Sequence, residues 1–248
     1  MLVSSDAIVL RSRKQGDTSK IVTLYSRDFG LVDVIAKGAR QLRSKFGSAL
    51  EPFTCSKIVF YKKEHTDLYL LSAAETITPV RNLTSHLDRI EAATHIAELL
   101  IKTQRHEESH PEQFDLVCKV LALLDSAIPE AAIAILAAFY LRYASLSGFA
   151  IMLDCPDSGN YYFDTDRGEV ICTDGPVPIS NRFIPVTGSL LGSMRYLQKN
   201  PIEKAPSLRL SEDAKNDLRH LFKIFFATHL EGMQQNRTKA GRVFSALK

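Results

Sequence analysis

The chain has 248 residues, of which 45% are hydrophobic and 24% are charged, and its formal net charge is +3. This composition is typical of a globular protein with one large domain or two smaller ones. The longest apolar segment, residues 131–141, is too short to span a bilayer, and the first residues lack the pattern of a secretory leader. Four cysteines do not make a disulfide framework, so we expect a cytoplasmic protein with no membrane association.

The charges are unevenly distributed along the chain. Residues 1–63 hold 12 Lys and Arg against 5 Asp and Glu, residues 64–180 hold 7 against 18, and residues 181–248 hold 12 against 5. A polyanion responds to the local field and not to the net charge. The basic N-terminal part therefore favours a nucleic acid as partner, although charges that merely solvate a surface would give a similar count.

The first third of the chain has the pattern of β-strands. Five short runs are rich in Val, Ile, Leu, Tyr and Phe and are separated by turn-forming residues. They are residues 6–10, 21–26, 31–36, 57–62 and 68–71. Five short strands predict a small barrel of the OB type, which binds oligonucleotides through one face and its flanking loops.

The predicted loop between the third and fourth strands carries a concentration of cations without any carboxylate. Within residues 37–50 they are Lys37, Arg40, Arg43 and Lys45, followed by the aromatic Phe46. Cationic side chains neutralise phosphates, and an exposed ring stacks on a base. We predict that these residues bind nucleic acid, with Phe46 either a stacking residue or an anchor of the loop. Further cations complete the predicted surface: Arg11, Arg13, Lys14 and Lys20.

After residue 79 the apolar residues recur at helical spacing. The pattern predicts a helix with Ser85 as its N-cap, a second helix over residues 112–124, and a third over residues 129–147 that stops at Gly148. The third helix is apolar nearly all round, which indicates a central position in a helical domain.

A last helix is predicted over residues 212–230, with Ser211 as its N-cap. Cations recur every four residues on one of its faces: Lys215, Arg219 and Lys223. This stripe, together with Arg142 in the apolar third helix, is a candidate site for an acidic partner peptide. The alternatives are a solvated face for the stripe and an internal ion pair for Arg142.

The segment from Cys155 to Gly175 resembles two halves of a zinc-binding motif. A structural zinc site takes four ligands, usually from two Cys-x-x-Cys pairs. Here Ser158 stands where the partner of Cys155 would be, and Gly175 stands where the partner of Cys172 would be. We therefore expect a degenerate site with no zinc and no other cofactor.

Four N-terminal segments closely resemble, in order and spacing, the bacterial recombination and repair mediator family RecO. They are residues 7–10, 16–30, 36–40 and 44–53. The resemblance continues through residues 68–75 and becomes only architectural over the helical part. Many family members carry a four-cysteine zinc ribbon where Cys155 and Cys172 lie, and this chain lacks half of those ligands.

The resemblance implies an α+β fold. A five-stranded OB-fold β-barrel over residues 1–80 would be followed by an α-helical domain over residues 81–248, with a zinc-ribbon-like remnant at about 153–178. It further implies binding of single- and double-stranded DNA, annealing of complementary strands, and loading of recombinase onto DNA coated by single-stranded-DNA-binding protein. The implied partners are the C-terminal tail of that protein, RecR and, in some pathways, RecF, with a nucleoid-associated location.

Two other functions are compatible with parts of the sequence. Five aspartates could form a divalent-metal nuclease site: Asp154, Asp157, Asp164, Asp166 and Asp174. Acidic turn residues are far commoner than catalytic pairs, and no phosphate-binding loop or nucleophile motif is present, so we expect no enzymatic activity. The second alternative is an OB-fold protein that binds RNA or acts in transcription, without annealing activity.

Overall fold

The computed structural model describes the chain except residues 64–65, 157–158, 176–179, 181 and 246–248, with side chains described up to residue 229. It divides into two compact units, Met1–Ala132 and Ile133–Lys248. Helices α1 and α2 thus belong to the same compact unit as the strands that precede them.

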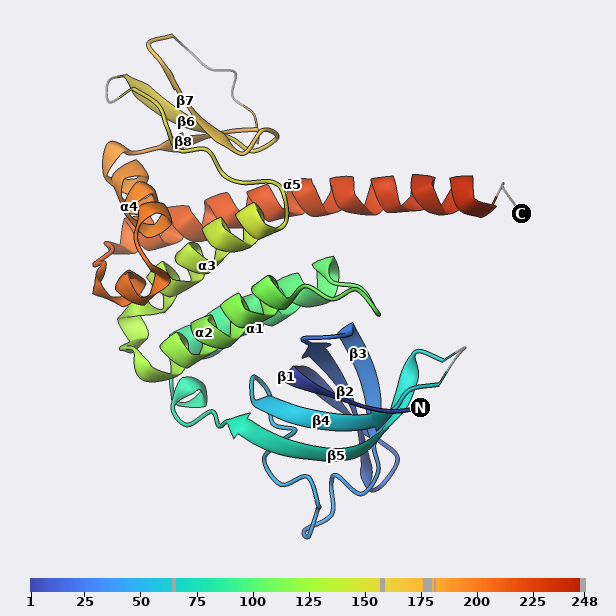
Figure 1. The fold of residues 1–248 in the computed structure, drawn as a ribbon. Coiled ribbons are helices and arrows are strands. Elements are labelled where there is room, and N and C mark those ends of the chain that lie inside the picture. The colour runs from blue at the N-terminus through green and yellow to red at the C-terminus, as the bar shows by residue number, and fades with distance from the viewer. Residues whose placement is uncertain (64–65, 157–158, 176–179, 181, 246–248) are drawn as a thin grey trace. The chain divides into compact units, whose positions relative to one another are not determined.

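The first unit is built on a closed barrel of five strands (Figure 1). The strands are β1 (Leu2–Gln15), β2 (Ser19–Ser26), β3 (Gly30–Ala36), β4 (Cys55–Tyr61) and β5 (Leu68–Thr78). Their order around the barrel is β1-β2-β3-β5-β4, in which β3 and β5 are parallel and the other pairs antiparallel. The predicted five-stranded OB-type barrel is therefore confirmed. β1 is long because its first half pairs with β4 and its second half with β2, with an irregular register between Val9 and Arg11.

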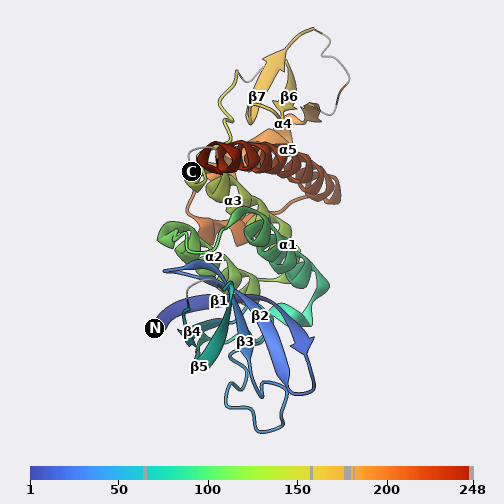
Figure 2. The same ribbon diagram turned by 90° about the vertical axis from the view of Figure 1, so that its right-hand side faces the viewer.

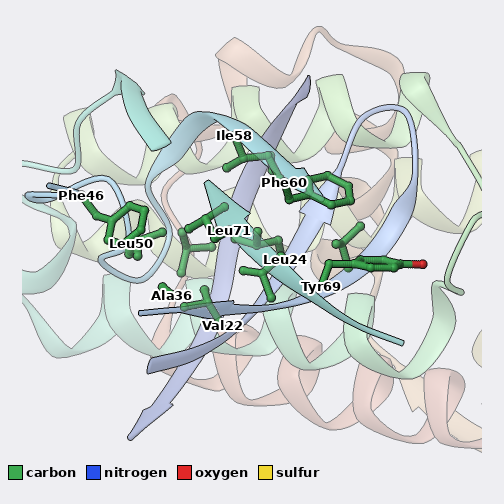
Figure 3. Packing of buried hydrophobic residues seen from close by; sticks show 13 residues of the cluster. Val22, Leu24, Ala36, Phe46, Leu50, Ile58, Phe60, Tyr69 and Leu71 are labelled. Carbon is green, nitrogen blue, oxygen red and sulfur yellow. The ribbon is translucent and has the colours of Figure 1, made fainter. Parts of the chain in front are cut away.

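The barrel encloses one apolar cluster. Alternate residues of each strand point inward, such as Val22 and Leu24 in β2. Figure 3 shows Phe46 and Leu50 at one end of this cluster and Phe60 and Tyr69 at the other. Each fully buried side chain of this size contributes about 1.5–3 kcal/mol, so the cluster is a main source of the barrel's stability.

Two helices complete the first unit: α1 (Leu87–Thr103) and α2 (Pro111–Ser126). The prediction of Ser85 as N-cap of the first helix was wrong. Ser85 ends a short 3-10 helix (Leu83–Ser85), its hydroxyl donates to the Asn82 carbonyl at 2.5 Å, and His86 occupies the N-cap position. The Ser85 hydroxyl is thus used within the 3-10 turn and does not cap α1, a local competition that sequence spacing alone did not reveal.

The segment joining α1 to α2 lies against the turn between β2 and β3. Gly30 has φ +64°, and a Cβ atom at this position would overlap the carbonyl oxygens of Arg105 and Glu108. The Leu31 amide donates to the Arg105 carbonyl at 2.9 Å, and the Glu107 amide donates to the Phe29 carbonyl at 2.9 Å. Only glycine permits this close backbone approach, so Gly30 determines how the segment packs on the barrel.

The second unit combines helices with a small sheet. Its elements are α3 (Ala132–Leu146), β6 (Asn160–Asp164), β7 (Glu169–Thr173), β8 (Phe183–Val186), α4 (Gly188–Lys199), a 3-10 helix (Ile202–Ser207) and α5 (Glu212–Ser245). The sheet is antiparallel in the order β7-β6-β8 (Figure 1), and Figure 2 shows β6 and β7 from a second side. Nearly all of α3 is buried, as its apolar composition predicts.

The sequence patterns missed part of this unit. Ser211 caps α5 as predicted, since its hydroxyl accepts from the Ala214 amide at 3.2 Å, but the helix continues to Ser245 instead of ending at residue 230. Neither β8 nor α4 was predicted. The short α4 begins at Gly188, a poor helix former, and is defined by its N-cap Thr187, whose hydroxyl accepts from the Leu190 amide.

Candidate nucleic-acid interface

The segment between β3 and β4 folds over one end of the barrel. It consists of successive tight turns, with hydrogen bonds such as Gln41 amide to Gly38 carbonyl at 3.1 Å and Ala49 amide to Phe46 carbonyl at 3.0 Å. Gly38 and Gly47 have φ values of +72° and +52°, which favour glycine. We call residues 37–45 the basic loop; the segment that contains it projects from the barrel in Figures 1 and 2.

Phe46 anchors this segment and does not present its ring to solvent. Its side chain is 3% exposed and packs in the barrel cluster beside Leu50 (Figure 3). The interpretation of Phe46 as a base-stacking residue is therefore wrong, and its alternative role as an anchor is correct. The reason is that the segment turns back on the barrel and places the Phe46 ring in the apolar cluster that the strands enclose.

The four cations of the basic loop are all exposed. Within the part of the chain that the structure describes, Lys37 and Arg43 have no hydrogen-bond or ion-pair partner. Arg40 donates from Nη1 to the carbonyls of Gly16 and Asp17 at 3.0 and 2.9 Å. These are neutral acceptors, so the guanidinium keeps its positive charge while it holds the loop beside the β1–β2 turn.

Lys45 is held in a similar way. Its ammonium donates to the Ser72 carbonyl at 2.6 Å and lies 5.1 Å from the centre of the Phe46 ring. Carbonyl and ring both stabilise a cation without neutralising it. The loop therefore presents two tethered cations, Arg40 and Lys45, and two that are free to adjust to a ligand.

Leu42 is a residue that the sequence reasoning missed. It lies between Arg40 and Arg43, and its side chain is fully exposed. The signal available in the sequence was an apolar residue within a segment that is rich in cations. Because this segment is predicted to be a loop, Leu42 would not belong to the apolar face of a strand or a helix. Its position between Arg40 and Arg43 places an exposed apolar group among the cations of the basic loop.

The cations predicted on β1 and β2 continue toward the loop. Lys14 pairs with Lys20 across the β1–β2 register, and Lys20 pairs with Ala36, the residue before Lys37. Lys20 also lies 3.5 Å from a carboxylate oxygen of Glu51, which reduces its availability. Lys14 is exposed, so the register extends the basic surface from the loop along the hairpin.

The other two predicted cations of β1 differ from each other. Arg11 donates from Nε to the Thr23 hydroxyl at 3.3 Å, and Thr23 donates to the Asp33 carboxylate at 2.5 Å. Arg13 is exposed and has no hydrogen-bond or ion-pair partner among the residues with described side chains. Arg13 is therefore better placed than Arg11 to bind a phosphate.

The candidate peptide site on α5 is less available than its spacing indicates. Lys215 forms an ion pair with Glu212 at 2.7 Å, and Arg219 is half-buried and donates to the Asn216 side chain at 3.2 Å. The ion pair also lowers the pKa of Glu212, because the Lys215 ammonium hydrogen-bonds to the charged carboxylate. Lys223 is the exposed member of the stripe.

Arg142 is used inside the second unit. It donates from Nη1 to the carbonyls of Ala138 and Leu197 at 3.0 and 3.1 Å, and from Nη2 to the carbonyl of Asn200. Burial lowers its pKa, and the negative charge of Glu203 opposes that shift. The expected internal partner was a carboxylate, whereas the hydrogen bonds go to backbone carbonyls, one within α3 and two at the end of α4.

The two cysteines of the degenerate motif have protein contacts. The Cys155 sulfur and carbonyl both accept from Arg195, at 3.4 and 2.7 Å, and Cys172 packs beside Gly159, where a Cβ atom would lie 2.7 Å from the sulfur. No group of three or more His, Cys, Asp or Glu side chains is arranged to hold a metal ion within the described residues. Ser158 and Asp157 lie outside the described residues.

Of the five candidate nuclease aspartates, Asp164 is buried and forms an ion pair with Arg182. Arg182 donates to both of its oxygens, at 3.1 and 2.7 Å. Burial acts to raise the pKa of Asp164, but hydrogen bonds from Arg182 and from two backbone amides outweigh it, so the pKa lies below its usual value. A carboxylate engaged in this way has little capacity left for a metal ion.

No helix of sufficient length and apolarity to cross a membrane was found in the described part of the chain.

Comparison with known families gives a consistent match over almost the whole chain. The family model described as "Recombination protein O N terminal" matches residues 1–80, and "Recombination protein O C terminal" matches residues 84–238. A "DNA repair protein RecO" of Rubrobacter xylanophilus is 33% identical over 97% of this chain and 97% of its own length. Proteins of the same name from Anaeromyxobacter dehalogenans and Desulfitobacterium hafniense are 31% and 30% identical over 92% and 89% of this chain, and over 91% and 82% of their own lengths.

Proposed function

The chain belongs to the RecO family of DNA repair and recombination proteins, and from this premise we propose that it is a stoichiometric mediator that binds single- and double-stranded DNA through the basic loop. The proposal includes annealing of complementary strands and loading of recombinase onto DNA coated by single-stranded-DNA-binding protein. The observation that supports it most directly is the exposure of Lys37, Arg40, Arg43 and Lys45 on one end of the barrel, with no carboxylate in the loop.

The proposed mechanism needs no bond chemistry. Each phosphate that a lysine or arginine neutralises releases condensed counterions, which favours binding. When the cations of the loop and of the β1–β2 hairpin neutralise phosphates on two strands, the repulsion between those strands falls. Complementary strands held on one protein, or on two copies, then pair more rapidly. No enzymatic step is proposed.

Leu42 takes the role first assigned to Phe46. We propose that its exposed side chain contacts the faces of unpaired bases while the neighbouring cations hold the phosphates. Apolar side chains such as leucine insert between base steps in several DNA-binding proteins. Leu42→Ala should weaken binding of single-stranded DNA about threefold to tenfold without changing the salt dependence, because no charge is lost. Unchanged affinity would assign the binding to phosphate contacts alone.

Charge reversal of Lys37 and Arg43, the two loop cations without a partner among the described residues, tests the proposed DNA surface. Lys37→Glu with Arg43→Glu should weaken DNA binding by at least about tenfold at moderate salt and flatten the slope of log K against log salt by 1 or more. These two positions are preferable to Arg40 and Lys45, whose hydrogen bonds also hold the loop in place.

The matched control is Lys204→Glu with Arg209→Glu, which makes the same change of net charge at two exposed positions of the second unit. Fluorescence anisotropy with a labelled oligonucleotide over a range of salt concentrations gives both quantities. If both double variants weaken binding equally, the effect is one of net charge and the basic loop is not the site.

An annealing assay tests the finer function. Complementary oligonucleotides coated with single-stranded-DNA-binding protein should anneal faster with this protein than without it. The Lys37/Arg43 variant should lose the acceleration, while the Lys204/Arg209 variant retains it. If DNA is bound but annealing is not accelerated, and a matched RNA oligomer competes equally well, the protein is an OB-fold RNA-binding protein instead.

The partners and the division of the chain are also part of the proposal. We expect binding to the acidic tail of single-stranded-DNA-binding protein, to RecR and, in some pathways, to RecF, in the cytoplasm at the nucleoid. The proposed domains are residues 1–80 and 81–248, and the degenerate motif at Cys155 and Cys172 is expected to hold no zinc. Metal analysis of the purified protein after dialysis would contradict this last point if it found one zinc per chain.

A further inference from the structure

Two cysteines of the first unit lie close together although they are distant in sequence. Cys55 is the first residue of β4, and Cys118 lies in α2. Their sulfur atoms are 3.9 Å apart, and both side chains are partly exposed. Sixty-three positions separate them along the chain, so the tertiary structure alone brings the two thiols together.

We propose that Cys55 and Cys118 form an oxidisable dithiol, which hydroperoxides convert into a disulfide between the barrel and α2. The proposal is independent of the proposed DNA-binding function. It rests on the distance between the sulfurs, on their partial exposure, and on their location in elements of one compact unit. To form the disulfide, the sulfurs must approach from 3.9 Å to the bonding distance of about 2.05 Å.

The two thiols differ in acidity. The hydrogen bond from Cys118 lowers the pKa of Cys55, whereas the same hydrogen bond and burial raise the pKa of Cys118. Among nearby carboxylates, Asp6 acts on both thiols, Asp115 acts on Cys118, and both carboxylates disfavour the thiolate. Since the thiolate is the nucleophile, Cys55 is the residue that attacks the peroxide first.

The reaction balances as two successive displacements. The Cys55 thiolate attacks one oxygen of hydrogen peroxide, the O–O bond breaks, and the products are a Cys55 sulfenic acid and, after protonation, one water. The Cys118 sulfur then attacks the Cys55 sulfur and displaces hydroxide, which takes up the Cys118 proton as a second water. The two sulfurs lose two electrons in total, and one peroxide is reduced to two waters.

Thiol counting on the full-length protein tests the proposal. Treatment of the reduced protein with hydrogen peroxide at a small molar excess should lower the free thiols from four to two, with Cys155 and Cys172 still reduced. Peptide mapping should find one linked pair, Cys55 with Cys118, and dithiothreitol should restore all four thiols. Retention of four thiols, or a linked pair that contains Cys155 or Cys172, would overturn it.

Single variants test the order of the two oxidation steps, and a stability measurement on each variant controls for a loss of folding. Cys118→Ser should leave a Cys55 sulfenic acid that dimedone traps, whereas Cys55→Ser should show little reaction at Cys118. Cys172→Ser is the matched control and should form the linked pair as the native chain does. Each variant is first compared in thermal unfolding under reducing conditions. Oxidation should then raise the midpoint of the native chain by roughly 5 °C or more and leave that of Cys118→Ser unchanged; equal shifts in both would contradict a cross-link.

Discussion

Cationic side chains serve opposite purposes in the basic loop and in the second unit. In the loop, Lys37 and Arg43 extend into solvent, and the tethers of Arg40 and Lys45 go to neutral acceptors, so all four positive charges stay available. In the second unit, Arg142 and Arg182 connect separate segments and use their hydrogen bonds internally. Sequence spacing therefore locates candidate cations, while the hydrogen-bond acceptors around each cation determine whether it is available to a ligand.

The two regions also differ in what anchors them. Phe46 holds the loop segment on the barrel through the burial of its apolar ring, so this anchor does not use any of the loop's cations. The second unit is held partly through its arginines. Substitutions in the loop should therefore separate stability from binding, and substitutions of the internal arginines should not.

The largest expected effect is at the anchor. Phe46→Ala should lower the free energy of unfolding by about 3–5 kcal/mol, because it removes a buried ring and leaves a cavity in the barrel. Phe46→Leu, which keeps most of the volume, should cost less than about 1.5 kcal/mol. Urea unfolding measures both. If Phe46→Ala retains native stability but loses DNA binding, the ring contacts bases after all.

The next effect concerns Arg142. Arg142→Met should destabilise the chain by about 2–3 kcal/mol, because carbonyls of Leu197 and Asn200 lose their donor. Lys199→Met, at an exposed position at the end of α4, should change stability by no more than about 0.5 kcal/mol. An Arg142→Met variant that is as stable as the native chain but no longer binds an acidic peptide would show that Arg142 belongs to a peptide site.

A smaller effect is expected from pH at Asp164. Its pKa is lowered in the folded chain, so the ion pair with Arg182 contributes its full stability above the unfolded value of about 4, and this contribution is lost as the pH falls through the folded pKa. Asp164→Asn should be less stable than the native chain at pH 7, and the difference should narrow below about pH 4. Thermal midpoints measured from pH 7 to pH 3 test this; a constant difference would mean that the pair does not titrate in that range.

The smallest effect should come from Lys223. Lys223→Glu should change stability by no more than about 0.5 kcal/mol and leave the DNA affinity and its salt dependence unchanged, because the residue is exposed and distant in sequence from the basic loop. The same titrations as for the Lys37/Arg43 variant provide the measurement. If Lys223→Glu lost as much DNA affinity as the Lys37/Arg43 variant, the cations of the basic loop would not differ from those of the second unit in DNA binding.

Local patterns were sufficient for the five strands of the OB-type barrel, for the position of the basic loop and for the family resemblance. Alternating apolar residues and turn-forming residues specify strands over a few positions, and the order of the N-terminal motifs is itself a sequence property. The limits of the helices were less well predicted: His86 and not Ser85 caps α1, and α4 was missed because its glycine-containing start resembles a loop.

Tertiary structure alone decided which loop residues face solvent. Phe46 and Leu42 are both large apolar residues in one cationic segment, and nothing in their spacing distinguishes them. The segment folds back over the open end of the barrel, which buries Phe46 and leaves Leu42 outside. The same holds for Arg142 and for the pair of Cys55 and Cys118, because their partners lie far away in the sequence and contact is a property of the folded chain.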